Sequence, residues 1–285
     1  MIPAAFEYVR AESVDHAASA LAQHGDEAKV LAGGQSLLPL MRLRLAAPEV
    51  VVDVGRLADL RGVREDGDAL IIGALTTHYD VINNELIRQH AGLLAEATST
   101  VADPAVRHRG TFGGSLAHAD PAGDLPATAL ALGAEMVVQG PGGRRSIPAR
   151  EFFVDYLQTA LSPDELLVEV RIPKYGPGWG FHYEKLHRVA QAWAIVGVAA
   201  AVRRENGSIA EARIGLTNMG PTPLRASATE AALSGAAASA DAVAAAARSA
   251  AEGTSPSSDL NAQADYREHL AQVLTKRAVS AAVGL

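Results

Sequence analysis

The chain has 285 residues, of which 48% are hydrophobic and 20% are charged, and its formal net charge is −7. This length and composition suit one large globular domain or two to three smaller ones. The acidic balance, without a basic patch interleaved with aromatic residues, argues against a nucleic-acid-binding protein. The sequence contains no cysteine, which excludes disulfides, thiolate nucleophiles, cysteine-ligated zinc and iron–sulfur ligation by this chain.

The sequence carries no targeting signal. Its N-terminus lacks the basic start and apolar core of a signal peptide. The longest apolar run, at 192–202, is shorter than the roughly 20 residues that span a bilayer. We therefore expect a cytoplasmic protein without a transmembrane segment.

The first fifty-odd residues are predicted to alternate between strands and helices. Apolar runs predict strands at 6–9, 28–32 and 50–54. Between the first two, Ser13 is a typical helix-capping residue and Gly25 a typical helix terminator. A strand–helix–strand–helix–strand unit follows from this order.

The stretch VLAGGQSLLPLMRLR, at 30–44, contains the first candidate site. Two glycines end an apolar strand, and Gln35 and Ser36 open an amphipathic helical run. Glycine lets a ligand approach the backbone, and the N–H groups of a first helical turn are free, so this pattern favours an anion site. Ser36 could cap the helix or donate to a phosphate oxygen. For two glycines alone, a tight surface turn with a capped helix is the plainer interpretation.

The next hundred residues contain two predicted hairpins and one predicted helix. A hairpin over 61–73 turns at Asp66-Gly67, and a second hairpin covers 135–147. Helix-spaced apolar residues predict a single helix over 86–101, which Asp103-Pro104 ends.

A second glycine-rich stretch, RGTFGGSLAHADPAGDLPAT at 109–128, follows that helix. Its glycines and prolines make a regular helix implausible before about Leu125. The flanks are apolar and uncharged, so a binding loop is favoured over disorder. The glycine-rich turns at 32–36 and 110–115 each offer clustered backbone donors, and together they would grip the pyrophosphate of a dinucleotide such as FAD. Neither the Rossmann fingerprint nor a Walker-type loop is present.

The sequence KYGPGWG, at 174–180, is the predicted domain boundary. Beyond it, three strands and then three helices predict an antiparallel meander with helices on one face. The expected strands are 181–187, 192–203 and 209–219, and the expected helices are about 227–233, 241–251 and 266–283.

Three ordered motifs, AGGQSLLPLMRLR, ADPAVRHRGTFGGSLAHADPAGDLPA and YEKLHRVAQAWAIVGVA, resemble the FAD-binding medium subunit of molybdenum hydroxylases, the xanthine dehydrogenase family. The likeness is strongest to the flavoprotein subunit of aerobic carbon monoxide dehydrogenase, and it covers essentially the whole chain. It implies an α+β fold with a vanillyl-alcohol-oxidase-type (PCMH-type) FAD-binding domain over 1–175, made of two α/β subdomains that meet near 55. A C-terminal domain over 176–285 would hold a three-stranded antiparallel sheet and a helical bundle.

The resemblance also implies which residues bind FAD, while it implies no catalytic residue and no metal ligand in this chain. All of these residues lie in or near the matching motifs. They are Ala32, Gly33, Gly34, Gln35, Ser36, Leu37, Val101, Ala102, Gly110, Thr111, Gly113, Gly114, Ser115, Asp124, Leu167, Lys185 and Trp193.

Their implied roles differ. The turn at 32–36 would hold the pyrophosphate, and the turn at 110–115 would supply a second set of donors. Asp124 would take a hydroxyl group of the adenosine or ribityl part, although it could also cap the helix that follows. Val101 and Leu167 would contact adenine or its neighbourhood.

At the flavin end, the resemblance places Trp193 against the isoalloxazine ring and Lys185 near the flavin. The alternative is that Trp193 is an ordinary core aromatic at the start of a strand. Three departures stand out, because relatives often carry His or Asn at Gln35, Asn at Ser115 and an acidic residue at Ala192. Gln and Ser can still form hydrogen bonds there, whereas Ala192 leaves the tuning of the flavin open.

Other residues give weaker signals. His78 and His118 have no companion ligands in the sequence, so loop or capping roles are favoured over metal binding. No Ser-His-Asp or paired-carboxylate constellation is evident.

The resemblance implies an electron-transfer subunit. A large molybdopterin-binding subunit and a small subunit with two [2Fe–2S] clusters would be its partners, in a dimer of heterotrimers that could associate peripherally with a membrane. Electrons would pass through the clusters to FAD and on to a quinone or another acceptor. Carbon monoxide is the first substrate to consider, before purines, aldehydes and N-heterocycles. A stand-alone FAD oxidase or dehydrogenase acting on a small substrate is the alternative, and a non-enzymatic nucleotide-binding protein is a third.

Overall fold

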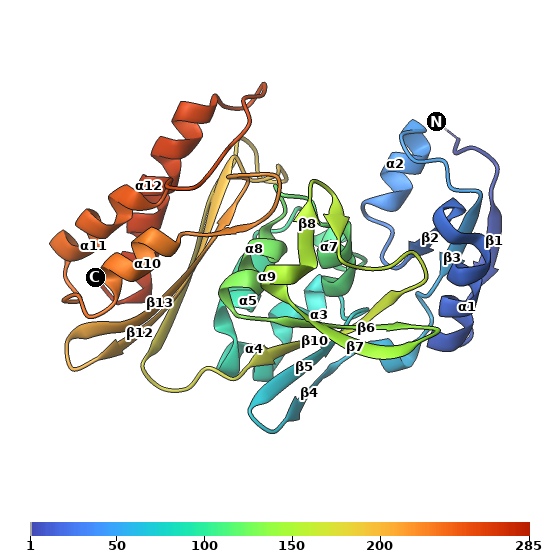
Figure 1. Cartoon of the computed structure of the whole chain (residues 1–285), viewed down its shortest axis with the longest axis horizontal. Coiled ribbons are helices and arrows are strands. Elements are labelled where there is room, and N and C mark those ends of the chain that lie inside the picture. The colour runs from blue at the N-terminus through green and yellow to red at the C-terminus, as the bar shows by residue number, and fades with distance from the viewer. Residues whose placement is uncertain (1) are drawn as a thin grey trace.

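A computed structural model describes residues 2–285 of the chain. Three blocks lie side by side along its long axis, and each is built around one β-sheet (Figure 1). The sheets have three strands in the N-terminal block, five in the central block and four in the C-terminal block. Within residues 2–285, no helix combines the length and the apolar character that a membrane crossing requires.

The N-terminal block confirms the predicted alternation of strands and helices. Its elements are β1 (Glu7–Arg10), α1 (Val14–His24), β2 (Ala28–Leu31), α2 (Leu37–Leu43) and β3 (Val50–Asp53), with the parallel strands in the order β1-β3-β2. The hydroxyl oxygen of Ser13 accepts from the His16 N–H at 3.0 Å, and Gly25 ends α1 with a φ of 51°. Because β2 is an edge strand, the glycine turn that follows it leaves the sheet beside the central block.

The central block contains the two predicted hairpins in one antiparallel sheet of order β4-β5-β10-β6-β7. Its strands are β4 (Val63–Asp66), β5 (Ala69–Gly73), β6 (Glu135–Gly140), β7 (Gly143–Pro148) and β10 (Leu166–Pro173). Its helices are α3 (His78–Asn83), α4 (Glu85–His90), α5 (Gly92–Ser99), α6 (Pro104–Arg107), α7 (Phe112–His118), α8 (Asp124–Ala131) and α9 (Ala149–Phe152). A small hairpin, β8 (Phe153–Asp155) and β9 (Gln158–Thr159), follows α9.

The prediction of one helix over 86–101 is wrong. The chain forms α4 and α5 instead, with a break at Ala91, whose φ and ψ are −146° and 48°. Asp103 does not end a helix but starts one, because its Oδ1 accepts from the Val106 N–H at 2.9 Å at the first turn of α6.

The prediction that no helix forms before about Leu125 is also wrong. Helix α7 forms across the glycines, and the side-chain oxygen of Thr111 caps it by accepting from the Gly114 N–H at 3.2 Å. A Cβ atom on Gly113 would lie 2.5 Å from the Cβ of Ala74. Gly113 therefore lets α7 pack closely against the end of β5, and its propensity cost is outweighed by tertiary packing.

The C-terminal block confirms the three antiparallel strands and adds a fourth of two residues. The strands are β11 (Trp179–Leu186), β12 (Val196–Glu205), β13 (Ser208–Thr217) and β14 (Leu224–Arg225), and the helices are α10 (Ser227–Leu233), α11 (Ala240–Ala246) and α12 (Ala264–Ala282). Strand β12 starts later than the predicted 192–203, because residues 192–195 form a loop.

Both faces of the C-terminal sheet are covered. On one face, α10, α11 and α12 bury Val198, Ala200 and Val202, while Ala199 and Ala201 alternate to the other face and join the core of the central block. On that second face, a Cβ atom on Gly215 would overlap the carbonyl oxygen of Ala127 in α8. Because successive side chains of a strand point to opposite faces of the sheet, the C-terminal sheet packs against its own helices on one face and against the central block on the other. This packing places the end of β11 beside the start of α8.

Candidate functional site

The two glycine-rich turns contact each other. A Cβ atom on Gly33 would overlap the carbonyl oxygen of Arg109 and lie 2.9 Å from the Cα of Gly110. Between them the turns border a cavity of about 490 Å³. The predicted FAD-binding residues that line this cavity are Ala32, Gly33, Gly34, Gln35, Ser36, Leu37, Gly110, Thr111, Gly114 and Ser115. We refer to it as the turn cavity.

The first turn presents a row of free backbone donors. No hydrogen bond within residues 2–285 uses the backbone N–H groups of residues 33–37. The hydroxyl group of Ser36 does not cap α2, which leaves it available as a donor as well. Gly34 adopts a φ of 75°, a backbone conformation that favours glycine. Adjacent N–H groups that point at one site form an anion-binding turn.

The second turn differs from the expectation of clustered free donors. The Gly110 N–H donates to Val106 O at 2.7 Å, the Gly114 N–H to the Thr111 hydroxyl at 3.2 Å, and the Ser115 N–H to Thr111 O at 3.1 Å. The first of these bonds follows α6 and the other two form the first turn of α7, while the Thr111 N–H has no partner within residues 2–285 and Ser115 lines the cavity. Gly113 is not among the residues that line the turn cavity.

A second cavity of about 190 Å³ adjoins the first. The two share their boundary residues Gln35, Ser36, His78, Ser115 and His118. Beyond this boundary, the second cavity is lined by five further predicted FAD-binding residues, which are Val101, Ala102, Asp124, Lys185 and Trp193. The structure therefore brings fifteen of the seventeen predicted residues to the two cavities, all except Gly113 and Leu167. We refer to the second cavity as the lysine cavity.

Leu167 does not reach either cavity. It lies in β10, is 4% exposed, and packs in the hydrophobic core of the central block. A buried strand position and a ligand-contacting position are indistinguishable in an apolar run, which is why the sequence could not separate them.

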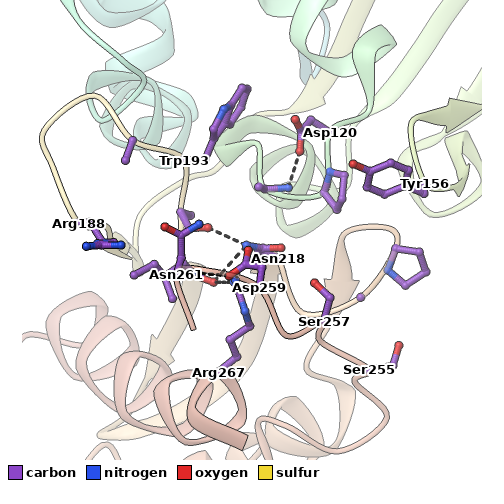
Figure 2. Close-up of a pocket in the computed structure, with 17 residues that line it drawn as sticks. Asp120, Tyr156, Arg188, Trp193, Asn218, Ser255, Ser257, Asp259, Asn261 and Arg267 are labelled. Carbon is purple, nitrogen blue, oxygen red and sulfur yellow. Dashed lines mark hydrogen bonds and ion pairs between the residues drawn. The ribbon is translucent and has the colours of Figure 1, made fainter. Parts of the chain in front are cut away.

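Trp193 lies on the loop that precedes β12 and not in the strand itself (Figure 2). Its side chain is 57% exposed, so the interpretation as a core aromatic is wrong. It lines the lysine cavity and also a third cavity, on the side of the C-terminal block.

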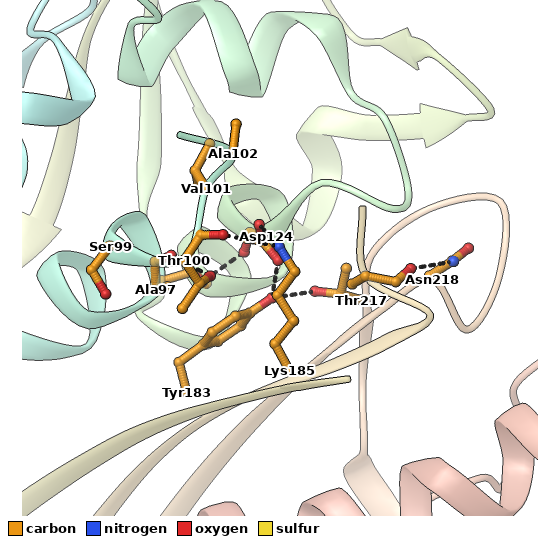
Figure 3. Close-up of polar contacts among 12 residues, drawn as sticks. Ala97, Ser99, Thr100, Val101, Ala102, Asp124, Tyr183, Lys185, Thr217 and Asn218 are labelled. Atoms are coloured by element: carbon orange, nitrogen blue, oxygen red, sulfur yellow. Dashed lines mark hydrogen bonds and ion pairs between the residues drawn. The ribbon is translucent and has the colours of Figure 1, made fainter. Parts of the chain in front are cut away.

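Asp124 and Lys185 form a buried ion pair at the base of the lysine cavity (Figure 3). Lys185 Nζ donates to Asp124 Oδ2 at 2.8 Å and to the carbonyl oxygen of Thr100 at 3.1 Å. The Tyr183 hydroxyl donates to Asp124 Oδ1 at 2.7 Å. The side chains of Asp124 and Lys185 are each 4% exposed. The pair links α8 of the central block to β11 of the C-terminal block.

The electrostatics of this group follow from its burial. Burial raises the pKa of Asp124, although the ammonium group of Lys185 and the Tyr183 hydroxyl oppose that change. Burial, together with the negative charge of Asp124, raises the pKa of Tyr183 well above its usual value. The carboxylate of Asp124 does not cap α8, whose N-cap residue is Gly123. Both carboxylate oxygens already accept hydrogen bonds, one from the Tyr183 hydroxyl and one from the Lys185 ammonium group.

His78 is a member of the site that the sequence did not predict. It is 3% exposed and lies under Gly110, where a Cβ atom would lie 2.8 Å from its Cδ2. Its Nε2 is 3.3 Å from the Ser115 hydroxyl oxygen, and its Nδ1 has no hydrogen-bond partner within residues 2–285. Burial and the nearby positive charge of Arg107 lower its pKa to about 4. A neutral imidazole therefore supports the junction of the two cavities.

The sequence indicates the position of His78 only indirectly. Thr77 caps α3 by accepting from the Asp80 N–H at 3.1 Å, and this cap fixes His78 at the first position of the helix. The capping residue Thr77 can be predicted from the sequence, whereas the burial of His78 depends on the distant turn at Gly110. Among residues 2–285, no group of three or more His, Asp or Glu side chains has the arrangement of a metal site.

Most of the chain is similar to two known protein domains. Residues 4–175 match the FAD binding domain in molybdopterin dehydrogenase, and residues 181–282 match the CO dehydrogenase flavoprotein C-terminal domain. The carbon monoxide dehydrogenase medium chain of Hydrogenophaga pseudoflava is 44% identical, over 99% of this chain and 98% of that one. The caffeine dehydrogenase subunit beta of Pseudomonas sp. strain CBB1 is 37% identical, over 99% of this chain and 96% of that one.

Solved structures agree with these matches. Carbon monoxide dehydrogenase from Hydrogenophaga pseudoflava, in a form that lacks the Mo-pyranopterin moiety, contains a chain with a TM-score of 0.97 and 46% identity, covering 100% of this chain and 99% of that one. Quinoline 2-oxidoreductase from Pseudomonas putida 86 gives a TM-score of 0.94 at 33% identity, with the same coverage. The chain therefore belongs to the family of FAD-binding medium subunits of molybdenum hydroxylases, with a C-terminal domain of the carbon monoxide dehydrogenase flavoprotein type, and it is an oxidoreductase subunit whose cofactor is FAD.

Proposed function

We propose that this chain is the electron-transfer subunit of an aerobic carbon monoxide dehydrogenase. Its partners would be a large molybdopterin-binding subunit and a small subunit with [2Fe–2S] clusters, and electrons from those clusters would reach FAD on this chain and leave to a quinone or another acceptor. The single observation that carries the proposal is the pair of adjoining cavities, in which both glycine turns and the Lys185 group converge. Similarity to carbon monoxide dehydrogenase medium chains supports the choice of substrate.

The turn cavity fits the pyrophosphate of FAD. Residues 33–37 offer backbone N–H groups without partners inside the chain, together with the Ser36 hydroxyl. A pyrophosphate needs several donors close together, and it is held well where side chains do not block the backbone. We infer that the first turn holds it, that Thr111 and Ser115 add contacts from the second turn, and that Gly110 and Gly114 keep that side open.

The lysine cavity fits the flavin end of the cofactor. An ammonium group has three N–H donors, and Lys185 uses two of them on Asp124 and Thr100. We infer that the third donates to a flavin carbonyl oxygen, with Asp124 and Tyr183 holding the ammonium group in place. Trp193 would cover the ring, and Ala102 lines the same cavity. Val101, for which the resemblance implied an adenine contact, lines this cavity too and would lie near the ring instead. Bound FAD would supply redox chemistry that accepts electrons one at a time or in pairs, and the protein orients the ring and sets the charge beside it.

We also infer that the chain divides near residue 175 into an FAD-binding domain over 1–175, with subdomains that meet near 55, and a C-terminal domain over 176–285. The separate sheets support this division, as do the ranges of the two matching families. The Asp124–Lys185 pair would then hold the two domains together at the flavin.

The experiment compares the chain purified alone with the chain purified together with its co-expressed partners. We expect visible flavin absorbance but no turnover from the isolated chain, because its buried Asp124, Lys185 and Tyr183 are committed to one another. The assembled complex should contain molybdenum and iron and oxidise carbon monoxide with an artificial acceptor.

Two results would contradict the proposal. Turnover of a small substrate by the isolated chain would favour a stand-alone flavin oxidase or dehydrogenase. An assembled complex that oxidises a purine or an aldehyde, but not carbon monoxide, would retain the flavoprotein role and overturn the choice of substrate.

A further inference from the structure

The three residues after α5, at 100–102, connect this helix to the start of α6 and contribute Val101 and Ala102 to the lining of the lysine cavity. They lie beside the Asp124–Lys185 pair (Figure 3). Ala102 adopts a φ of 44°, in the left-handed region that residues other than glycine avoid. Such a conformation persists only where its surroundings impose it. We refer to residues 100–102 as the joining segment.

All three carbonyl groups of the joining segment accept hydrogen bonds from cationic side chains. Lys185 Nζ donates to Thr100 O at 3.1 Å, and Arg107 Nη1 donates to Val101 O at 2.8 Å and to Ala102 O at 3.2 Å. The two bonds of Arg107 are the only hydrogen bonds that its side chain makes within residues 2–285. Hydrogen bonds from charged donors are among the stronger ones in proteins, so these two cations fix the orientation of the peptide groups.

Arg107 is held in place by the turn that it closes. Asp103 Oδ1 accepts from the Val106 N–H at 2.9 Å, and Asp103 O accepts from the Arg107 N–H at 2.9 Å. The side chain of Arg107 then reaches back to the carbonyl groups that precede Asp103. Arg107 itself lines neither the turn cavity nor the lysine cavity, so any effect on a ligand passes through the joining segment.

The joining segment presents two groups to the flavin end of the site. Thr100 O holds the ammonium group of Lys185, whose third N–H group is proposed above to donate to the flavin. The Ala102 N–H has no partner within residues 2–285. Because C=O and N–H point in opposite directions across a trans peptide, the bond from Arg107 to Val101 O also fixes the direction of the Ala102 N–H group.

We propose that Arg107 is a positioning residue for the flavin site. By binding two carbonyl groups of the joining segment, it holds Ala102 in its left-handed conformation and keeps Thr100 O in place beneath Lys185. The inference rests on the proposed function and deepens it, because it names a residue outside both cavities that sets how the lysine cavity meets the cofactor.

The test uses the full chain, with FAD affinity measured by titration of flavin fluorescence. Arg107→Met keeps an unbranched side chain but removes the donors, and it should weaken FAD binding by about tenfold. Arg88→Met is the matched control. Arg88 also donates to a backbone carbonyl of the central block, Ile82 O at 2.8 Å, but it lines neither cavity. This control should bind FAD like the wild type.

Two further measurements separate positioning from a general loss of stability. The first is the midpoint potential of the bound flavin at saturating FAD. A cation beside the flavin favours its reduced form, so displacement of Lys185 in Arg107→Met should lower the potential, whereas Arg88→Met should leave it unchanged. The second is Ala102→Gly, which removes the steric cost of the left-handed conformation. Added to Arg107→Met, it should restore part of the lost affinity.

Equal FAD affinities and equal potentials for Arg107→Met and Arg88→Met would overturn this inference and leave the proposed function intact. Where Arg107→Met does not fold, the pair Ala102→Val and Ala102→Gly decides with Arg107 still in place, because a β-branched residue disfavours a positive φ. Weaker binding by the valine variant alone would support the inference, and equal binding by the two would overturn it. A wild-type chain that retains no FAD would overturn the proposed function and this inference with it.

Discussion

Gly33 and the carbonyl group of Arg109 lie so close together that a Cβ atom at position 33 would overlap the carbonyl oxygen. The glycine therefore serves the contact between the two turns, in addition to any contact with a ligand. The spacing between the two turns, which line the same cavity, depends on this contact.

Gly33→Ala should weaken FAD binding without unfolding the chain. Moving the turns apart by one methyl group costs about 1–3 kcal/mol, as overpacking does elsewhere, which corresponds to roughly five- to 150-fold in affinity. Gly176→Ala is the matched control, because a Cβ atom there meets nothing within 4 Å. FAD titration followed by flavin fluorescence measures both, and equal affinities would show that the turns can separate without loss.

Lys185→Met should strongly destabilise the folded chain. It leaves the carboxylate of Asp124 buried without its cation, a change that costs about 3–5 kcal/mol in other proteins. The double variant Lys185→Met/Asp124→Leu removes both charges and should recover most of the loss. Urea unfolding of the single and double variants gives the comparison, and a double variant no more stable than the single one would contradict the ion-pair interpretation.

The same variant has a predicted pH dependence. Burial raises the pKa of Asp124 above its ordinary value of 3.8, and removal of the Lys185 charge raises it further. A carboxyl group whose pKa is raised by folding stabilises the folded state below its unfolded pKa, and this contribution is lost as pH rises through the folded pKa. The stability difference between wild type and Lys185→Met should therefore shrink as the pH falls toward 3.8.

His78 should make the folded chain sensitive to mild acid. Its pKa falls from 6.5 to about 4 on folding, chiefly because it is buried. The stability that depends on neutral His78 is fully present above pH 6.5 and is lost as the pH falls to about 4, by about 3 kcal/mol in total. His78→Gln removes this dependence, so wild type should lose more unfolding free energy than the variant across that range. Parallel pH slopes for the two proteins would contradict the assignment.

Local patterns in the sequence predicted the strands and capping residues that depend on neighbouring residues alone. Ser13 and Gly25 bound α1 as expected, and the two hairpins of the central sheet form at the expected places. The glycine turn after β2 also has the free donors that its strand–turn–helix pattern predicted. These features need no knowledge of distant segments.

The failures share a cause, which is packing between segments far apart in the sequence. Gly113 allows a helix where glycine propensity argued against one, because Ala74 lies against it. Asp124 does not cap α8, the alternative role that its position suggested, because Tyr183 and Lys185 from another block bind its carboxylate. Buried His78 depends in the same way on Gly110.

The capping bond of Thr111 offers a further test of the second turn. Its hydroxyl oxygen accepts from the Gly114 N–H at 3.2 Å and so fixes the start of α7, beside Ser115. Thr111→Val keeps the shape of the side chain but removes this acceptor, which should cost about 1 kcal/mol of stability.

Ser239→Ala removes a comparable cap at the start of α11, where the Ser239 hydroxyl oxygen accepts from the Ala242 N–H at 3.4 Å. Ser239 lies outside both the turn cavity and the lysine cavity. Both variants should therefore lose a similar amount of stability in urea unfolding, but only Thr111→Val should also lower FAD affinity, because its cap positions the Ser115 hydroxyl at the junction of those cavities. If the two variants lose stability equally and both keep wild-type FAD affinity, the second turn contributes to the fold and not to the cofactor. If Thr111→Val alone binds FAD more weakly, the start of α7 is part of the binding site.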